Sequence, residues 1–160
     1  MIVDPTHHVH MFRSAPEHLF RGARLNGDYE SEYSGSGETP TSIDPIVATL
    51  FAAYQRSKGK AFVLILEKGQ FRERLGGPSL RKYSGIELAV NLALPPMEVQ
   101  KLATKTLPIE ISLAILKDMG FPLIEKLFGI TQLQDALGDE KRLIPQQIEE
   151  YSRRALEVKL

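Results

Sequence analysis

Apolar residues recur at helical spacing in the stretch ETPTSIDPIVATLFAAY, which covers residues 38–54. The positions that repeat in this way are Ile46, Val47, Leu50, Phe51 and Tyr54. Ser42 or Asp44 precedes them as a candidate N-cap, and Pro45 suits the first turn of a helix. The pattern therefore predicts a helix that begins near Pro45, preceded by more capping side chains than one helix start requires.

The run AFVLILE at residues 61–67 is apolar without a break up to its last residue. Continuous apolar runs of this length are typical of a strand buried on both faces. The stretch HLFRGARL at residues 18–25 and the run IELAVNLAL at residues 86–94 also have strand-like patterns, and the second stops at Pro95 and Pro96. These segments predict an α/β arrangement in the first part of the chain.

Beyond Pro96 the pattern changes to short helical segments. These segments are MEVQKLA, IEISLAILKDMG, PLIEKLFG, TQLQDALG and PQQIEEYSRRALEVKL, and they are bounded by Gly120, Gly129, Gly138, Pro122 and Pro145. We therefore expect an α+β protein with a core over residues 1–96 and a helical C-terminal extension over residues 97–160. The extension is expected to pack on the core as one domain.

Length and composition fit one globular domain, because the chain has 160 residues, of which 42% are apolar and 25% charged. Its 20 basic and 20 acidic residues cancel, so no bulk attraction to nucleic acid or to an anionic membrane is expected. The absence of cysteine excludes disulfides and a cysteine nucleophile. No segment approaches the roughly 20 apolar residues of a membrane span. A cytoplasmic protein is expected, and a secreted or injected effector would have the same composition.

Three polar features lie where a plain fold has no need of them. They are Arg21 in the first strand-like stretch, Thr41 and Ser42 before the apolar helix, and Glu87 at the start of a strand. A carboxylate buried in a strand costs several kcal/mol unless a partner compensates it. An arginine, a hydroxyl and a carboxylate that meet in one cleft suit a ligand that carries phosphates and a ribose.

Each of these residues also has a purely structural interpretation. Thr41, Ser42 and Asp44 can serve as helix caps, and a good cap is worth about 1 kcal/mol. Arg21 can form a surface salt bridge, and Glu87 can lie on the polar face of an edge strand. If these residues form one active site, all of these structural interpretations are replaced by a functional one.

Three further clusters carry weaker signals. The histidines His7, His8 and His10 have no acidic or cysteine ligand at a characteristic spacing, so no metal site is expected. A set of basic residues suits either a solvated loop or contacts to phosphates: Arg72, Arg74, Arg81 and Lys82. An apolar stripe on the last helix suits packing on the core or binding of a protein partner: Ile148, Tyr151, Ala155 and Leu156.

The order of the polar features resembles the ADP-ribosyltransferase family of the arginine-serine-glutamate type. The matching segments are LFRG at residues 19–22, TPTSIDPIVATLFA at residues 39–52 and SGIELAV at residues 84–90. In that family a strand with Arg-Gly is followed by Ser-Thr-Ser-Leu-Asp-Pro before a helix, and later by a catalytic glutamate. The resemblance covers about residues 19–96, and its middle motif is the most specific part.

The resemblance implies a compact fold with a split β-sheet core, and transfer of ADP-ribose from NAD to a protein or nucleic-acid acceptor with release of nicotinamide. It implies that Arg21 anchors the phosphates and ribose of NAD, and that the backbone of Gly22 lies against the nicotinamide amide. Ser42 or Thr41 would orient the glutamate. Glu87 would accept a hydrogen bond from the ribose 2′-hydroxyl and stabilise an oxocarbenium-like transition state.

The resemblance also implies that Tyr54 contributes to NAD binding and that Tyr83 and Gly85 belong to a loop facing the acceptor. Two positions depart from the family pattern. Pro40 stands where the family has its first serine, and Gly85 stands where arginine-modifying members have Glu or Gln. Arginine is therefore disfavoured as the acceptor, while another acceptor, hydrolysis of NAD, or binding without turnover stay open. The alternative is a non-catalytic module that binds a protein partner through its C-terminal helices.

Overall fold

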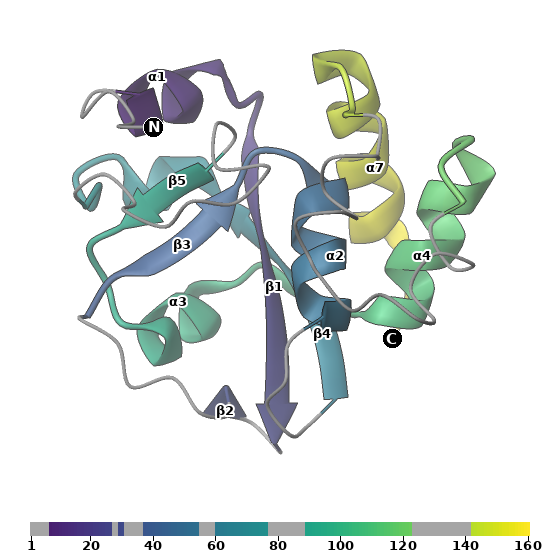
Figure 1. The fold of residues 1–160 in the computed structure, drawn as a ribbon, viewed down its shortest axis with the longest axis horizontal. Helices are drawn as coiled ribbons and strands as arrows, with labels where there is room; N and C mark the ends of the chain where they lie inside the picture. The colour runs from purple at the N-terminus through teal and green to yellow at the C-terminus, as the bar shows by residue number, and fades with distance from the viewer. Residues whose placement is uncertain (1–6, 27–28, 31–36, 55–59, 77–88, 123–141) are drawn as a thin grey trace.

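The structure is a computed structural model that describes residues 7–26, 29–30, 37–54, 60–76, 89–122 and 142–160. In these residues the strands are β1 (His18–Asn26), β2 (Tyr29–Glu30), β3 (Thr39–Ser42), β4 (Lys60–Glu67), β5 (Ala89–Leu92) and β6 (Lys105–Pro108). The helices are α1 (His7–Ser14), α2 (Pro45–Tyr54), α3 (Pro96–Leu102), α4 (Ile109–Asp118) and α7 (Pro145–Glu157), with a 3₁₀ turn η1 (Lys68–Phe71). The expected α+β class is confirmed (Figure 1).

The strands form one antiparallel sheet in the order β5-β3-β1-β4-β6, and β2 pairs with the end of β1. β1 and β4 are paired along nearly their whole length, from His18 opposite Glu67 to Leu25 opposite Lys60. On its other edge, β1 pairs with β3 through Phe20 and Ser42 alone among the described residues. In Figure 1 β3 meets β1 near one end and diverges from it. The sheet is therefore continuous on the β4 side of β1, whereas on the other side β3 pairs at Phe20, β2 pairs at Leu25 and Asn26, and the described strands leave an opening between these points.

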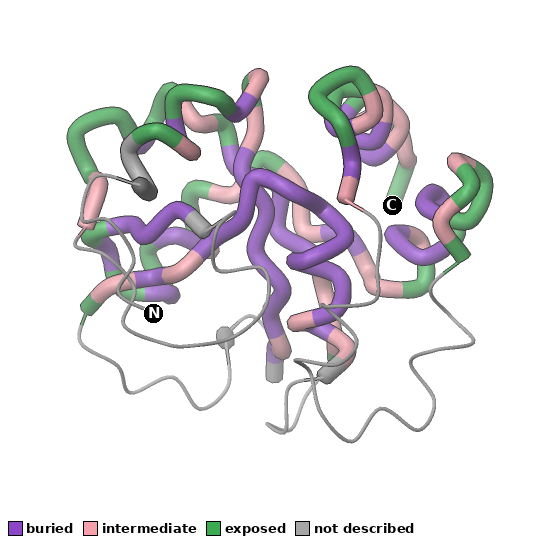
Figure 2. The backbone as a smooth tube through the Cα atoms, turned by 45° about the horizontal axis from the view of Figure 1, so that its top comes forward, coloured by how far each residue is buried: buried purple, intermediate pink, exposed green. Residues whose placement is uncertain are grey.

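Successive residues of β1 point to opposite faces of the sheet, and each face has its own core. Phe20 packs in a cluster with residues of β4, α2, α4 and α7, which we call the α2-side core. Leu19 and Ala23 pack in a second cluster with residues of α1, η1, β4 and β5, which we call the α1-side core. Figure 2 shows that the backbone of β1 and α2 is almost entirely buried. β1 is thus the central strand of the molecule.

Helix α2 begins at Pro45 as the sequence pattern predicts, because the Asp44 carboxylate accepts a hydrogen bond from the Ile46 N–H at 2.8 Å. The helix then packs directly on β1 at Gly22. A Cβ atom on Gly22 would overlap the carbonyl oxygen of Ala48 and lie 2.5 Å from the amide nitrogen of Ala52. The glycine of the Arg-Gly pair therefore has a structural purpose, which is to let α2 approach the sheet.

The expected strand at residues 61–67 is confirmed, and its residues Val63, Leu64, Ile65 and Leu66 are fully buried in sequence. The expected helices at α3, α4 and α7 are also confirmed. Ile148, Tyr151 and Ala155 pack the inner face of α7 into the α2-side core, as expected for the apolar stripe.

The helical pattern beyond Pro96 did not predict strand β6, which joins the sheet beside β4. The histidine-bearing segment forms helix α1 rather than an extended strand. Among the described residues, no group of His, Asp and Glu is arranged to hold a metal ion. In the same part of the chain, no helix has the length and apolar character needed to cross a membrane. The segments PLIEKLFG and TQLQDALG, with Arg81 and Lys82, lie outside the described residues.

Candidate functional site

Arg21 lies where the sheet opens between β1 and β3. Its side chain is buried, with 7% of the residue exposed, and its Nη1 donates a hydrogen bond to the carbonyl oxygen of Pro40 at 2.9 Å. Along the rest of this edge the backbone ladder does not join the two strands, so the guanidinium spans the opening instead. Arg21 is therefore not a surface residue, because it is buried within the sheet.

Thr41 is buried on β3, and its hydroxyl donates to the carbonyl oxygen of Val90 on β5 at 2.7 Å. Thr39, also buried, donates in the same way to the carbonyl oxygen of Leu94 at 2.7 Å. Both threonines thus join β3 to β5, in addition to the backbone register that sets Thr41 opposite Val90. Neither hydroxyl caps helix α2.

Ser42 is the residue at which three strands meet. It is paired with Phe20 of β1 and with Ala89 of β5, and we call these three residues the strand junction. The Ser42 side-chain oxygen accepts a hydrogen bond from the Asp44 N–H at 3.1 Å. The extra polar residues before α2 therefore have different roles. Asp44 caps the helix, Ser42 accepts a hydrogen bond from the Asp44 N–H, and Thr41 bonds β3 to β5.

The register decides which of the predicted residues face one another. Ser42 is paired with Phe20, so it shares the α2-side face of the sheet with that residue. Arg21 and Thr41 are their immediate neighbours, and alternation along each strand sets both on the opposite face. The structure thus brings Arg21 together with Thr41, and it separates the two from the side chain of Ser42.

Of the other residues predicted to form the site, the structure describes only Gly22 in full. Gly22 is buried under α2, as described above. Tyr54 is the last residue of α2, and its side chain lies outside the described part. Tyr83, Gly85 and Glu87 also lie outside the described residues.

Asp44 has a second partner that the sequence did not indicate. Its other carboxylate oxygen accepts a hydrogen bond from the Leu143 N–H at 3.1 Å, across 99 residues of sequence. Burial raises the pKa of Asp44 to about 6, although the hydrogen bonds from Ile46 and Leu143 and the charge of Arg142 lower it. An ionised carboxylate at neutral pH is therefore held between α2 and the start of α7.

A chain of buried hydroxyls connects three helices below Phe20. The Thr49 hydroxyl lies 2.8 Å from that of Ser112, which in turn lies 2.7 Å from the hydroxyl of Tyr151. Burial raises the pKa of Tyr151 well above its usual value. Its ring meets that of Phe20 edge to face, at 5.5 Å between centroids. The sequence signal for these linked hydroxyls was the presence of one polar residue within each of two apolar helical runs, namely Thr49 and Ser112.

A carboxylate near the strand junction was also missed. The Asn91 side-chain amide donates to the Glu38 carboxylate at 2.5 Å, and the Gly76 N–H donates to the backbone oxygen of Asn91 at 2.8 Å. A Cβ on Gly76 would lie 2.9 Å from the Glu38 carboxylate. The first glycine of the Gly76-Gly77 pair was the local signal, because it makes room for this side chain.

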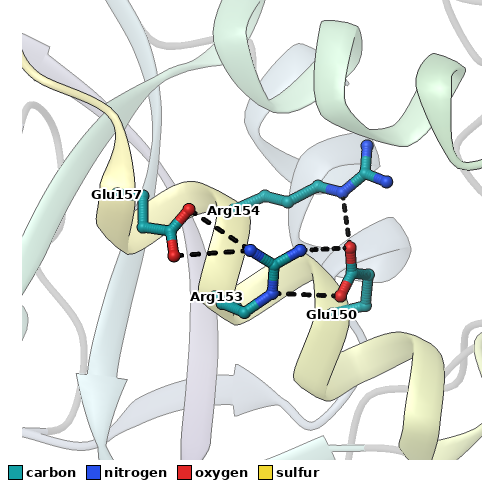
Figure 3. Close-up of polar contacts among 4 residues, drawn as sticks. All are labelled: Glu150, Arg153, Arg154 and Glu157. Atoms are coloured by element: carbon teal, nitrogen blue, oxygen red, sulfur yellow. Dashed lines mark hydrogen bonds and ion pairs between the residues drawn. The ribbon is translucent and has the colours of Figure 1, made fainter.

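The outer face of α7 is charged and internally paired, as Figure 3 shows. Arg153 and Arg154 both donate to Glu150, at 2.6 and 2.7 Å, and Arg153 also contacts Glu157 at 3.3 Å. The hydrogen bonds from the two arginines lower the pKa of Glu150 to about 2. These side chains are solvent-exposed, so the outer face of α7 has the composition of a solvated helix surface.

The chain matches no protein-family model, no curated protein and no solved structure. The case for a function rests on the residues of the chain itself and on their contacts.

Proposed function

We propose that this protein is an NAD-dependent ADP-ribosyltransferase, which transfers ADP-ribose from NAD to a macromolecular acceptor and releases nicotinamide. The observation that carries the proposal is the meeting of the three motif-bearing strands. Arg21 on β1 contacts β3 beside Thr41, and β3 is paired with β5, the strand that begins two residues after Glu87 in the sequence. The motifs of Arg21 and of Thr41 thus lie on adjacent strands although they are about 20 residues apart in the chain.

Arg21 is proposed to bind the diphosphate and the adjoining ribose of NAD. A guanidinium has five N–H donors in a planar fork, which suits paired phosphate oxygens. Its bond to the Pro40 carbonyl oxygen fixes one side of this fork and so orients the group at the opening between β1 and β3. Gly22 and Tyr54 are proposed to contribute further contacts to NAD.

Glu87 is proposed as the catalytic carboxylate. When the bond between the ribose C1′ and the nicotinamide nitrogen breaks, nicotinamide leaves with the electron pair and positive charge develops on the ribose. A carboxylate that accepts from the 2′-hydroxyl stabilises this charge. An acceptor nucleophile then forms a bond to C1′ and loses its proton. Thr41 is proposed as the orienting hydroxyl, because it shares a face with Arg21, and Ser42 as its neighbour at the end of strand β3.

The loop with Tyr83 and Gly85 is proposed to face a protein or nucleic-acid acceptor. The second candidate function is a non-catalytic module that binds a protein through its C-terminal helices. One observation favours it: the hydroxyl of Thr41 already bonds to Val90, and that of Ser42 already accepts from Asp44. With Pro40 at the position of the first serine, these side chains are engaged in holding the scaffold.

The test is incubation of the protein with NAD that carries a label in the adenylate part. Nicotinamide release and transfer of the label to protein or nucleic acid are followed by chromatography and mass spectrometry. We expect release by the wild type and a loss of at least about 100-fold for Glu87→Ala, as for other electrostatic contributions of this kind. Glu73→Ala, an exposed glutamate close in the sequence, is the matched control and is expected to retain the wild-type rate.

Absence of nicotinamide release from the folded wild type would overturn the proposal and favour the interaction module. Equal rates for the wild type and Glu87→Ala would leave an NAD-consuming activity with a different carboxylate. Glu38, which is already held by Asn91, is the described carboxylate to substitute next in that case.

A further inference from the structure

Asp44 makes contacts that a helix cap alone does not require. One oxygen of its carboxylate accepts from the Ile46 N–H, the other accepts from the Leu143 N–H, and its own N–H donates to the Ser42 side chain. The residue is 1% exposed. Three segments, namely the end of β3, the start of α2 and the start of α7, are thus joined through one side chain and its backbone.

Besides its packing in the α2-side core, helix α7 and the residues that flank it form hydrogen bonds to other described segments at three places. At its start, Leu143 bonds to Asp44. In its middle, Tyr151 bonds to Ser112 on α4. At its end, Lys105 of β6 donates to the carbonyl oxygens of Leu156, at 3.2 Å, and of Val158. Of these attachments, the one at Asp44 reaches the polar residues near the opening of the sheet.

The path from Asp44 to the site is short. Ser42, which accepts from the Asp44 N–H, is the residue that pairs β3 with β1 through Phe20 and with β5 through Ala89. A displacement of Asp44 therefore moves the strand junction. Thr41 precedes Ser42 on the same strand, so its position relative to Arg21 changes as well.

We infer that Asp44 is a positioning residue that holds the Thr41–Ser42 end of strand β3 to the start of helix α7, so that the C-terminal helix sets the geometry of the NAD site. The inference rests on the proposed function for its link to NAD. The connection between α7 and the end of strand β3 stands on the hydrogen bonds alone.

The choice of aspartate at this position supports the inference. Serine or asparagine caps a helix about as well as aspartate does, and neither requires the burial of a charge. Here, however, two N–H donors from different elements each bond to a separate oxygen, and an ionised carboxylate provides both oxygens as acceptors. In the described segments around Asp44, the charged group that acts on it is Arg142, which favours the ionised form.

The variant Asp44→Asn separates the cap from the connection. The amide oxygen retains the bond to the Ile46 N–H, while the amide NH₂ cannot accept from the Leu143 N–H. The control is Lys105→Met, which removes the attachment at the other end of α7 and leaves Asp44 untouched. Both variants are measured in the full chain, by steady-state release of nicotinamide from NAD between pH 5 and pH 8.

For Asp44→Asn we expect kcat to fall about tenfold with KM changed less than about twofold, because the end of strand β3 is displaced rather than unfolded. The wild-type kcat is expected to fall as the pH drops through about 6, where Asp44 takes up a proton and gives up one acceptor. Asp44→Asn lacks this step, and Lys105→Met retains it. Wild-type values of kcat and the same pH step in Asp44→Asn would overturn the inference.

If the wild type releases no nicotinamide, the proposed function fails and the connection is tested by amide hydrogen exchange. Exchange at Thr41 and Ser42 is expected to quicken at least about tenfold in Asp44→Asn but not in Lys105→Met. Unchanged exchange at Thr41 and Ser42 in Asp44→Asn would overturn the inference independently of any activity.

Discussion

The two edges of strand β1 are joined to their neighbours by different means. On the β4 side a backbone ladder runs from His18 to Leu25, and four consecutive paired residues of β4, from Val63 to Leu66, are apolar and fully buried. On the β3 side the ladder is reduced to Phe20 and Ser42, and the Arg21 side chain bonds to the Pro40 carbonyl oxygen instead. A ladder is fixed once the chain has folded. A guanidinium can also donate hydrogen bonds to the phosphate oxygens of a ligand. The β3 edge of β1 therefore suits the binding of a phosphate-bearing ligand.

The energies of the two edges differ accordingly. Burial of one leucine or isoleucine side chain on β4 contributes about 2 kcal/mol, and several follow in sequence. A hydrogen bond that involves a charged group contributes about 2 kcal/mol for a single contact. Stability is therefore concentrated on the β4 and α2 side, whereas the proposed binding of NAD lies on the β3 side. Substitutions on the two sides are expected to separate stability from ligand binding.

The largest effect is expected from Gly22→Ala, which tests the closed side. The added Cβ would overlap the Ala48 carbonyl oxygen, so α2 must move away from β1. We expect a loss of at least about 3 kcal/mol in the free energy of unfolding, measured by urea denaturation. Gly69→Ala is the control, because a Cβ on Gly69 has no atom within 4 Å. Equal stability of the two variants would contradict the close packing of α2 on β1.

The features of the closed side were those most accessible from sequence. Helix α2 was predictable because Asp44, Pro45 and the apolar spacing all act locally, and β4 because its apolar run is unbroken. Strand β6 was not predictable, since four residues with one buried leucine carry little pattern and the strand forms by pairing with β4. Strand β6 therefore depends on a contact with a segment that is distant in the sequence.

On the open side, sequence identified the residue types but not their arrangement. The register sets Thr41 on the same face as Arg21 and sets the side chain of Ser42 on the opposite face. Which hydroxyl shares a face with Arg21 depends on the pairing of Phe20 with Ser42, and a shift of one residue would reverse it. The hydrogen bond from the Leu143 N–H to Asp44 joins positions 99 residues apart, so no local sequence pattern predicts it.

The second prediction concerns pH and the connection between α2 and α7. Because burial raises the folded-state pKa of Asp44 from 3.8 to about 6, the folded protein binds more protons than the unfolded chain between these values. The free energy of unfolding is therefore expected to fall as the pH rises from about 4 to about 6, by up to about 3 kcal/mol, and to level off above that. The measurement is urea denaturation at each pH.

Other carboxylates titrate in the same range, so the contribution of Asp44 is taken as the difference between the wild type and Asp44→Asn. Glu150, whose pKa is lowered to about 2, acts in the opposite direction, and its stabilising effect is lost as the pH falls. It cancels in this difference. A difference that is constant from pH 4 to pH 7 would show that Asp44 titrates alike in the folded and unfolded states.

The third prediction tests the open side with Arg21→Met, which keeps most of the side-chain volume and removes the charge. We expect a loss of at least about 2 kcal/mol in the free energy of unfolding, since the charged hydrogen bond to the Pro40 carbonyl oxygen disappears. Binding of NAD, measured by isothermal titration calorimetry, is expected to be lost. Retained affinity for NAD with reduced stability would assign Arg21 a structural role only.

The smallest effect on stability, and the sharpest test of the open edge, is expected from a pair of matched threonine substitutions. Thr39 and Thr41 lie on the same face of β3, are both buried, and each donates at 2.7 Å to a backbone oxygen in or just after β5. Thr39→Val and Thr41→Val are each expected to cost about 1 kcal/mol, because each removes one neutral hydrogen bond. Since the two residues differ mainly in distance from Arg21, only Thr41→Val is expected to slow nicotinamide release, by about tenfold. Equal rates in the two variants would mean that the β3–β5 bonds act on the fold alone, and that the chemistry at the open edge depends on Arg21 without help from its neighbouring hydroxyl.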